Sequence, residues 1–314
     1  METASPIQRR SLKRKDGSTA EFDVLLIDSH EKWMPASESK STKTMEFGDR
    51  RISIELHGIS LNEFFSIQQS TYIPQWDNAD GEEPDPKWAE MKFDRVCDRR
   101  MALIEAALRT KFPGETIEER REYYKRRSTG EIQALMDAVH SHATCFVEMM
   151  NTPMIQDYRS CCESGLVVSS GNFFENWGEA TNSQYTLLFQ RPQDSFISEL
   201  RLRGLTQEAN IKIEKECEPG DPPLRAIRDQ NNPRGRVIRS VPNTQDPEYQ
   251  SRVSNCNKKK TLLQAEQCLT FQVPGTTFVE RLEWLGSRIA GDVQTLKQFI
   301  DSKILSYEEE LQTF

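Results

Sequence analysis

The sequence predicts an α+β fold that is mostly helical and consists of two tandem copies of a small β element followed by a three- to four-helix block. The first observation is a repeated phrase, PGETIEER at 113–120 and PGTTFVER at 274–281. The match continues without a gap from Asp85 to Leu135 in the first copy, and a register kept this long indicates an internal duplication. The second observation is that a segment with the period of a strand precedes each helical block.

The matched residues are those that helices need at their ends. Asp-Pro pairs at 85–86 and 246–247 place an N-cap acid before a proline at the first helical position. The T-x-x-E pattern of a capping box stands at 116–119 and again at 277–280. Each copy is therefore expected to contain three helices, at 86–111, 117–127 and 131–148 in the first copy and at 247–271, 278–288 and 292–310 in the second.

The β element precedes each helical block and is matched more loosely. Segments 50–69 and 196–215 both have strand period, then a glycine, then helical period, and Gly58 aligns with Gly204. Each copy is also predicted to contain a strand further upstream, at EFDVLLID (21–28) and QYTLLFQR (184–191).

Four segments follow from these boundaries. The expected organisation is a basic disordered tail over 1–18, a first module over 19–153, a connector over 154–182 and a second module over 183–314. Polar or turn-rich composition further predicts three loops, at 36–44, 77–86 and 218–247.

The overall charge limits the classes of partner. Lys and Arg number 41 against 49 Asp and Glu, which gives a net charge of −8. An acidic body is a poor general binder of nucleic acid or of an anionic membrane, because both require an excess of basic side chains. No apolar run reaches the length of a membrane span, and the seven cysteines include no CxxC pair. We therefore expect a cytoplasmic protein whose partners are proteins.

No arrangement of reactive side chains predicts a catalytic, cofactor-binding or metal-binding residue. The basic run at 9–15 is more typical of a solvated tail than of a nucleic-acid arm. His140 and His142 stand two positions apart, which directs two helical side chains away from each other, and the second copy has no histidine there. Cys161 and Cys162 have no adjacent base. The sequence favours a protein that is not an enzyme, and an unrecognised active site between the copies is the alternative.

Aromatic side chains near the predicted loops are the candidate partner-binding residues. Exposed aromatics in loops often mark a protein interface. The alternative for each tryptophan is that it anchors its loop on its own domain. The candidates are Trp33, Trp76, Trp177, Phe64 and Phe65.

The repeated unit resembles the tail assembly chaperones of long-tailed bacteriophages. The resemblance is carried by Ile52 to Phe65, where a strand and a glycine lead into a helix, and by Gly130 to Val139, where a late helix begins after glycine with an acidic residue. Leu200 to Ala209 and Gly291 to Ile300 repeat these features.

The resemblance implies a non-catalytic function in the host cell cytoplasm. Proteins of this family coat the helical tape-measure protein and recruit tail-tube subunits before the tube polymerises, so it implies these two partners, no cofactor and no catalytic residue. The tandem duplication departs from the family pattern. It leaves open whether this chain acts as the chaperone or is a structural or adaptor component of the virus particle.

Overall fold

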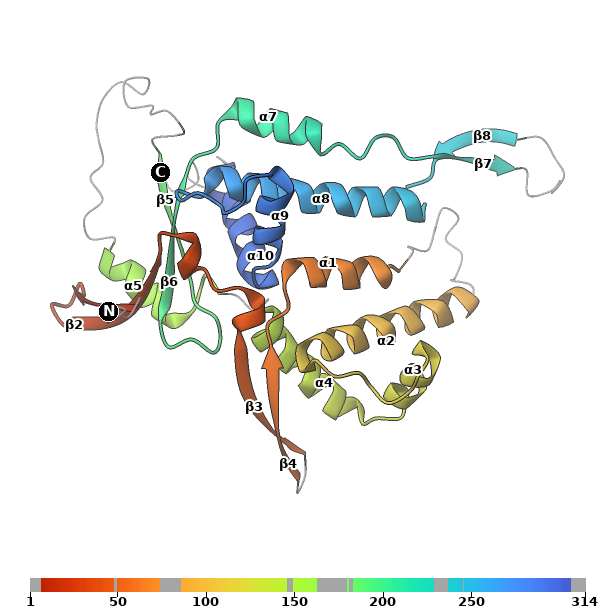
Figure 1. Ribbon diagram of the computed structural model, residues 1–314, viewed down its shortest axis with the longest axis horizontal. Helices are drawn as coiled ribbons and strands as arrows, with labels where there is room; N and C mark the ends of the chain where they lie inside the picture. Colours follow the sequence, from red (N-terminus) through yellow and green to blue (C-terminus); the bar gives the residue numbers. More distant parts are fainter. Residues whose placement is uncertain are drawn as a thin grey trace.

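The computed structural model describes residues 7–47, 50–73, 86–145, 149–162, 180, 183–228, 237–244 and 246–305. It has the expected α+β fold, with a β-sheet at one end and a layer of helices at the other (Figure 1).

Strands from both copies form one mixed sheet in the order β1-β2-β6-β5. β1 (Ile7–Lys13) and β2 (Thr19–Ile27) are antiparallel, as are β5 (Gln184–Phe189) and β6 (Ile197–Arg203). The two hairpins meet where β2 and β6 pair in parallel. Alternate residues of β2 are buried against helix α5 (Pro153–Cys162), as the period of a strand with one buried face requires.

The first module continues from a short 3-10 turn, Ala36–Glu38, into a hairpin and a series of helices. The hairpin consists of β3 (Lys40–Phe47) and β4 (Arg50–His57). The helices are α1 (Leu61–Ser70), α2 (Pro86–Leu108), α3 (Ile117–Lys125) and α4 (Thr129–Ala138), which ends in a π-helical turn, Val139–Thr144.

The second module has the same order of elements. After the β5–β6 hairpin come α7 (Gln207–Glu216), α8 (Pro247–Cys268), α9 (Phe278–Gly286) and α10 (Ala290–Phe299), which again ends in a π-helical turn, Ile300–Ile304. Its one addition among the described residues is a hairpin of β7 (Leu224–Arg228) and β8 (Val237–Pro242), placed between α7 and α8.

The turn that precedes α3 is repeated before α9 in atomic detail. The capping boxes at 116–119 and 277–280 both form, which confirms that prediction. Gly114 and Gly275 adopt φ of +131° and +125°, and a Cβ at either position would lie 2.8 Å from the Cβ of the capping glutamate. The turn therefore requires glycine in both copies.

The register of the hairpins changes one correspondence that the sequence suggested. The sequence pattern pairs the strand at 184–191 with the one at 21–28, but in the structure β5 occupies the place of β3. Each of these strands pairs with the strand that precedes the shared glycine. Gly58 donates to the Ser39 carbonyl at 2.9 Å, and Gly204 donates to the Ser183 carbonyl at 3.1 Å. The repeat therefore includes the residues before each hairpin, where the pattern E-x-W-x-x-A-x-x-S occupies 31–39 and 175–183.

Three predicted irregular segments are partly regular. The prediction of a disordered basic tail is wrong for residues 7–13, which form β1. Arginines of this segment pair with acidic side chains across the sheet, as Arg10 does with Glu199 at 2.7 Å. The prediction of a loop at 36–44 is also wrong, because this segment contains the 3-10 turn and most of β3. The segment at 218–247 contains the β7–β8 hairpin. The predicted loop at 77–86 lies outside the described residues up to Pro86, which begins α2.

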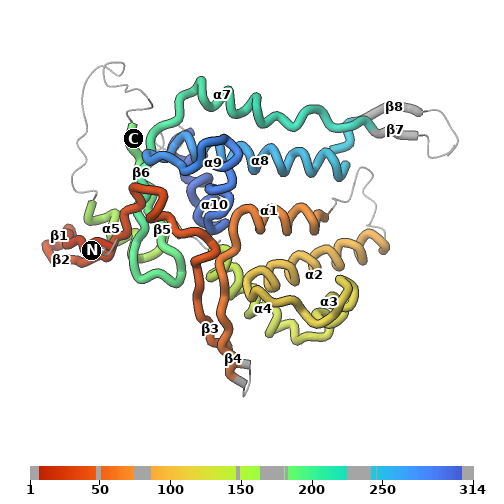
Figure 2. The backbone as a smooth tube through the Cα atoms, in the orientation of Figure 1, coloured from red at the N-terminus to blue at the C-terminus, as the bar shows by residue number. Residues whose placement is uncertain are grey.

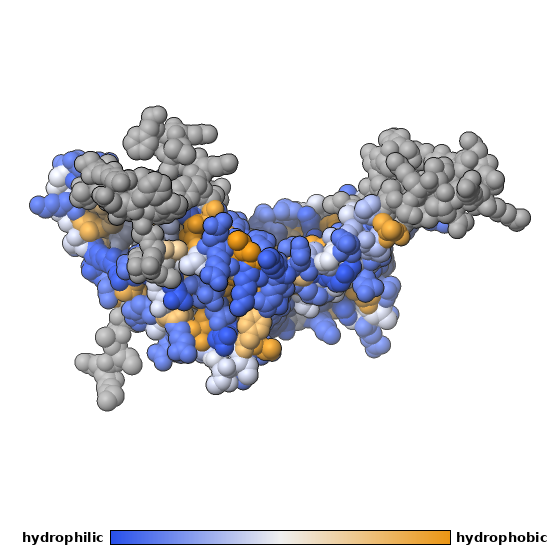
Figure 3. All heavy atoms as spheres, turned by 90° about the horizontal axis from the view of Figure 1, so that it is seen from above, coloured by the Kyte–Doolittle hydropathy of each residue, from blue (hydrophilic) through white to orange (hydrophobic). Residues whose placement is uncertain are grey.

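Helices α7, α8, α1 and α2 stack in one layer in that order (Figures 1 and 2). Helix α1 belongs to the first module but lies between its own α2 and the α8 of the second. One core, to which both modules contribute, includes Leu61, Ile104, Leu285 and Leu296. The outer face, seen from above over α7, is mainly hydrophilic (Figure 3), so α7 closes the stack on that side.

Candidate docking groove and the joint between the modules

Trp33 fixes the first module to the second. Its side chain is 1% exposed, and its indole Nε1 donates to Asp292 Oδ2 at 3.2 Å. The indole also packs edge-on against Trp284, with ring centres 6.0 Å apart. Arg288 donates to the Trp33 carbonyl, and the Ala36 amide donates to the Ser287 carbonyl at 3.0 Å. The 31–39 segment of one copy is thus docked on the α9–α10 joint of the other.

A buried ion pair lies beneath this contact. Arg191 follows β5, and its guanidinium donates to both carboxylate oxygens of Asp292, at 3.1 Å and 2.6 Å. Burial alone would lower the pKa of Arg191, but the charge and hydrogen bonds of Asp292 raise it overall. Arg191 therefore keeps its charge, and its contact with Asp292 connects the sheet, α10 and the Trp33 segment at one point.

Asp194 is the second carboxylate near Arg191, and its contact with the guanidinium is too long to offset the cost of its burial. Its Oδ2 lies 4.0 Å from Arg191 Nη1, and this oxygen has no hydrogen-bond partner among the described residues. Burial raises the pKa of Asp194 to about 6, since the attraction of Arg191 is weaker than burial and the charge of Asp292 adds to the rise.

Because its pKa is higher in the folded protein than in the unfolded chain, Asp194 takes up a proton on folding between about pH 4 and pH 6. Its contribution to stability is complete below about pH 4 and is lost as the pH rises through about 6. We expect Asp194→Asn to leave stability unchanged near pH 4 and to raise it by on the order of 2 kcal/mol at pH 7. Urea unfolding of variant and parent across this range measures the difference.

Asp157→Asn is the control for this prediction, because its pKa is shifted the other way. A hydrogen bond from Arg14 lowers the pKa of Asp157, so removing that carboxylate should reduce stability increasingly as the pH rises. A pH-independent effect of Asp194→Asn would contradict the prediction.

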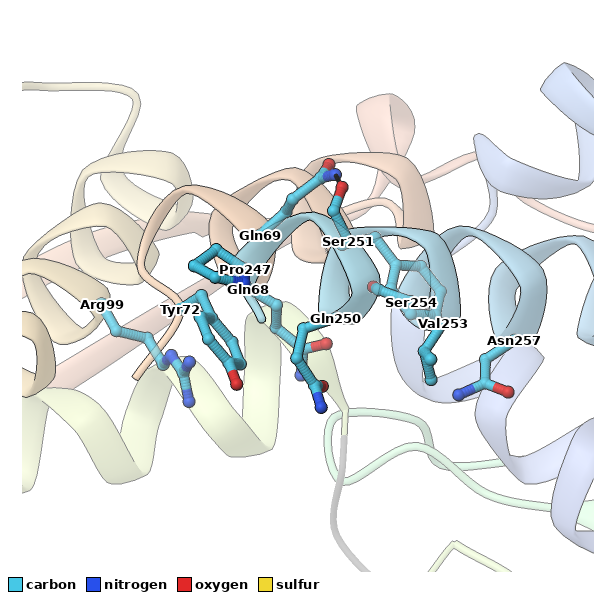
Figure 4. Close-up of a pocket in the computed structure, with 11 residues that line it drawn as sticks. Gln68, Gln69, Tyr72, Arg99, Pro247, Gln250, Ser251, Val253, Ser254 and Asn257 are labelled. Atoms are coloured by element: carbon cyan, nitrogen blue, oxygen red, sulfur yellow. Dashed lines mark hydrogen bonds between the residues drawn. The ribbon is translucent and has the colours of Figure 1, made fainter. Parts of the chain in front are cut away.

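A groove opens where α1 meets the first half of α8, at the boundary of the modules (Figure 4). It has a volume of about 350 Å³. Gln69 Nε2 donates to Ser251 Oγ at 2.6 Å and closes one side. On the other side the ends of Tyr72, Arg99 and Gln250 extend in the same direction (Figure 4). The lining residues are amide, hydroxyl and apolar, with one cation: Phe65, Gln68, Gln69, Tyr72, Arg99, Pro247, Gln250, Ser251, Val253, Ser254 and Asn257.

Arg99 lines this groove, and Lys258 follows the lining residue Asn257 on α8. Within the described part of the chain, no carboxylate lies within ion-pair distance of Arg99 or Lys258. Arg99 donates to Thr71, at 3.2 Å to its Oγ1 and 3.1 Å to its carbonyl, and Lys258 lies over the Phe65 ring, 6.0 Å from its centre. Burial lowers the pKa of both side chains. An anionic group in the groove would compensate both.

The structure separates the aromatic candidates. Trp33 and Phe64 are buried in the core, so neither presents a surface to a partner, and for Trp33 the anchoring alternative is correct. Phe65 is half-buried and lines the groove. Trp76 and Trp177 lie outside the described residues. Arg99 and Lys258 could not be predicted from the sequence, because no local pattern indicates whether a carboxylate from elsewhere in the fold will lie near either side chain.

The other reactive side chains are not gathered into a site. His140 and His142 lie in the π-helical turn after α4, and burial lowers the pKa of both. Cys161 is buried under the sheet, whereas Cys162 is exposed. Among the described residues no cluster of His, Cys, Asp or Glu has the arrangement of a metal site, and no helix combines the length and apolarity needed to cross a bilayer.

Comparison with known proteins gives no relative for this chain. No family model, no curated protein and no solved structure matches it.

Proposed function

We propose that this chain is a non-catalytic assembly protein of the tail assembly chaperone type, which binds a helical segment of another protein in the α1–α8 groove. The observation that carries the proposal is the groove itself: Arg99 lines it and Lys258 lies beside it over the Phe65 ring, and neither has a carboxylate partner among the described residues. Grooves between helices accept amphipathic helices, whose apolar face supplies affinity and whose polar residues fix register.

The chemistry of the groove favours an acidic amphipathic helix. Phe65 and Val253 supply apolar surface, while Gln68 and Gln250 can pair with a polar backbone or side chain. Burial removes water that would otherwise stabilise the charges of Arg99 and Lys258, and a carboxylate placed near either side chain would stabilise its charge instead. The partners under this proposal are the long helical tape-measure protein and the tail-tube subunits, as the resemblance of the repeated unit implies.

The test is a titration of the full chain with fluorescent peptides that cover the helical segments of a tape-measure protein, together with isolated tail-tube subunits. We expect acidic helical peptides to bind and matched peptides with Lys in place of Glu to bind at least about tenfold more weakly, which corresponds to the loss of one charged contact. Arg99→Glu and Lys258→Glu should each weaken binding by a similar factor.

Lys92→Glu is the matched control, because Lys92 is an exposed cation on the same helix as Arg99 and lies over Trp88 instead of in the groove. It should bind like the parent. Equal affinity for acidic and basic peptides, or no response to Arg99→Glu, would rule out the groove. A chain that binds neither tape-measure helices nor tube subunits would overturn the proposed function as a whole.

A further inference from the structure

The α3–α4 joint of the first module has the same geometry as the joint on which Trp33 docks. Arg288 Nε donates to the Trp284 carbonyl at 3.3 Å, and its guanidinium lies 4.2 Å from the centre of that ring. Arg127 Nε donates to the Tyr123 carbonyl at 3.3 Å, and its guanidinium also lies 4.2 Å from the ring centre. The first module therefore contains a preformed copy of this acceptor.

The two acceptors differ in what covers them. Arg288 is 5% exposed because the Trp33 segment lies over it. Arg127 is exposed, together with its neighbours from 126 to 130. At Gly291 an added Cβ would overlap the Thr144 and Cys145 carbonyls, but at Gly130 it would meet only Ser128 Oγ, at 3.9 Å. Within the described part of the chain, the acceptor of the first module is therefore uncovered.

The chain contains a second copy of the segment that fills such an acceptor. The pattern E-x-W-x-x-A-x-x-S that holds Trp33 recurs at 175–183 and places Trp177 in the equivalent position. The end of the recurrence is described. A Cβ at Gly204 would lie 2.5 Å from the Ala180 carbonyl, and one at Gly58 would lie 2.7 Å from the Ala36 carbonyl. The second segment thus meets its hairpin in the same way as the first.

Charge and position both indicate that the occupant comes from another molecule. Residues 172–183 contain Glu175 and Glu179 and no basic residue, whereas the acceptor carries the run Lys125, Arg126 and Arg127. The described end of the second segment, Ala180 and Ser183, contacts Gly204 beside the β5–β6 hairpin, whereas the acceptor follows α3 on the opposite side of the molecule (Figures 1 and 2). The first copy docks on the second within the chain, and repetition of that step requires the first copy of the next chain.

We propose that the chain assembles head to tail, with residues 175–183 of one molecule seated on the Tyr123–Arg127 joint of a second copy. This contact is heterologous, so each molecule offers one donor and one acceptor, and assembly continues into rings or filaments. It should be weaker than the contact within the chain, because Tyr123 and Ser128 replace the larger apolar Trp284 and Ile289. The inference is independent of the groove and of its ligand.

The test uses two full-length variants that each lose one half of the contact. Trp177→Ala removes the donor, and Arg127→Glu reverses the charge of the acceptor. Analytical ultracentrifugation should show the mass of the parent rising with concentration, while each variant alone stays monomeric. An equimolar mixture should form a one-to-one dimer and nothing larger, because only one intact donor and one intact acceptor remain per pair.

Trp76→Ala is the control, since Trp76 lies outside the repeated pattern, and it should assemble like the parent. Unfolding curves of all variants show whether the fold is retained, and a labelled peptide of residues 172–186 provides a second measurement. It should bind the parent and Trp177→Ala but not Arg127→Glu. A parent that stays monomeric and ignores the peptide, or a mixture that forms no dimer, would overturn the proposal.

Discussion

Replacing Asp292 by Asn is expected to destabilise the protein by about 3–5 kcal/mol, the usual cost of removing one member of a buried ion pair. The substitution leaves the Arg191 guanidinium buried and removes the charged acceptor of the Trp33 indole. Both contacts join the two modules, so the change should lower the denaturant midpoint of the whole chain. Guanidinium unfolding followed by far-UV circular dichroism measures it.

A double-mutant cycle separates the cost of leaving one charge of the Arg191–Asp292 pair unpaired from the cost of altered packing. Arg191→Met and Asp292→Leu should each cost about 3–5 kcal/mol, while the double variant should cost at least about 2 kcal/mol less than their sum, because no uncompensated charge remains. Additive costs would contradict the account, since they would mean that the two side chains act independently.

Replacing Gly291 by Ala is expected to destabilise the protein by about 3 kcal/mol, whereas the same change at the equivalent Gly130 should stabilise it by about 0.5 kcal/mol. Both glycines lie in the first turn of a helix that follows a repeated joint. The Gly291 methyl would overlap two carbonyls of the first module, while the Gly130 methyl would enter open space and reduce the freedom of the unfolded chain.

Thermal unfolding of these two variants and the parent provides the comparison. Gly291→Ala should melt below the parent and Gly130→Ala slightly above it. Similar shifts for both variants would mean that the close approach of α10 to Thr144 and Cys145 does not exist in solution.

The helices could be predicted from the sequence because their boundaries depend on neighbouring residues. The Asp246 side chain accepts from the Tyr249 amide at 2.9 Å, as an N-cap before proline does. The turn before α9 likewise follows from a glycine and a capping box that lie within six residues, Gly275 to Glu280. These signals appear in both copies, which is why the internal repeat was visible.

The β register and the joint could not be predicted in this way, because they depend on residues distant in the chain. Trp33 and Asp292 are 259 positions apart, and no local pattern connects them. The basic run at 9–15 has the composition of a solvated tail, yet Arg10 and Arg14 meet Glu199 and Asp157 across the fold. The groove could not be predicted for the same reason, because Arg99 stands out only when the structure shows no carboxylate near it among the described residues.

The proposed function requires a partner helix to bind between α1 and the first half of α8. Hydrogen–deuterium exchange on the full chain, with and without a saturating acidic helical peptide, tests it most directly, because bound segments open less often. We expect slower exchange over 64–73 and 247–258 and unchanged exchange in the β1–β2 hairpin. Slower exchange confined to segments outside these two ranges, at full occupancy of the peptide, would contradict it.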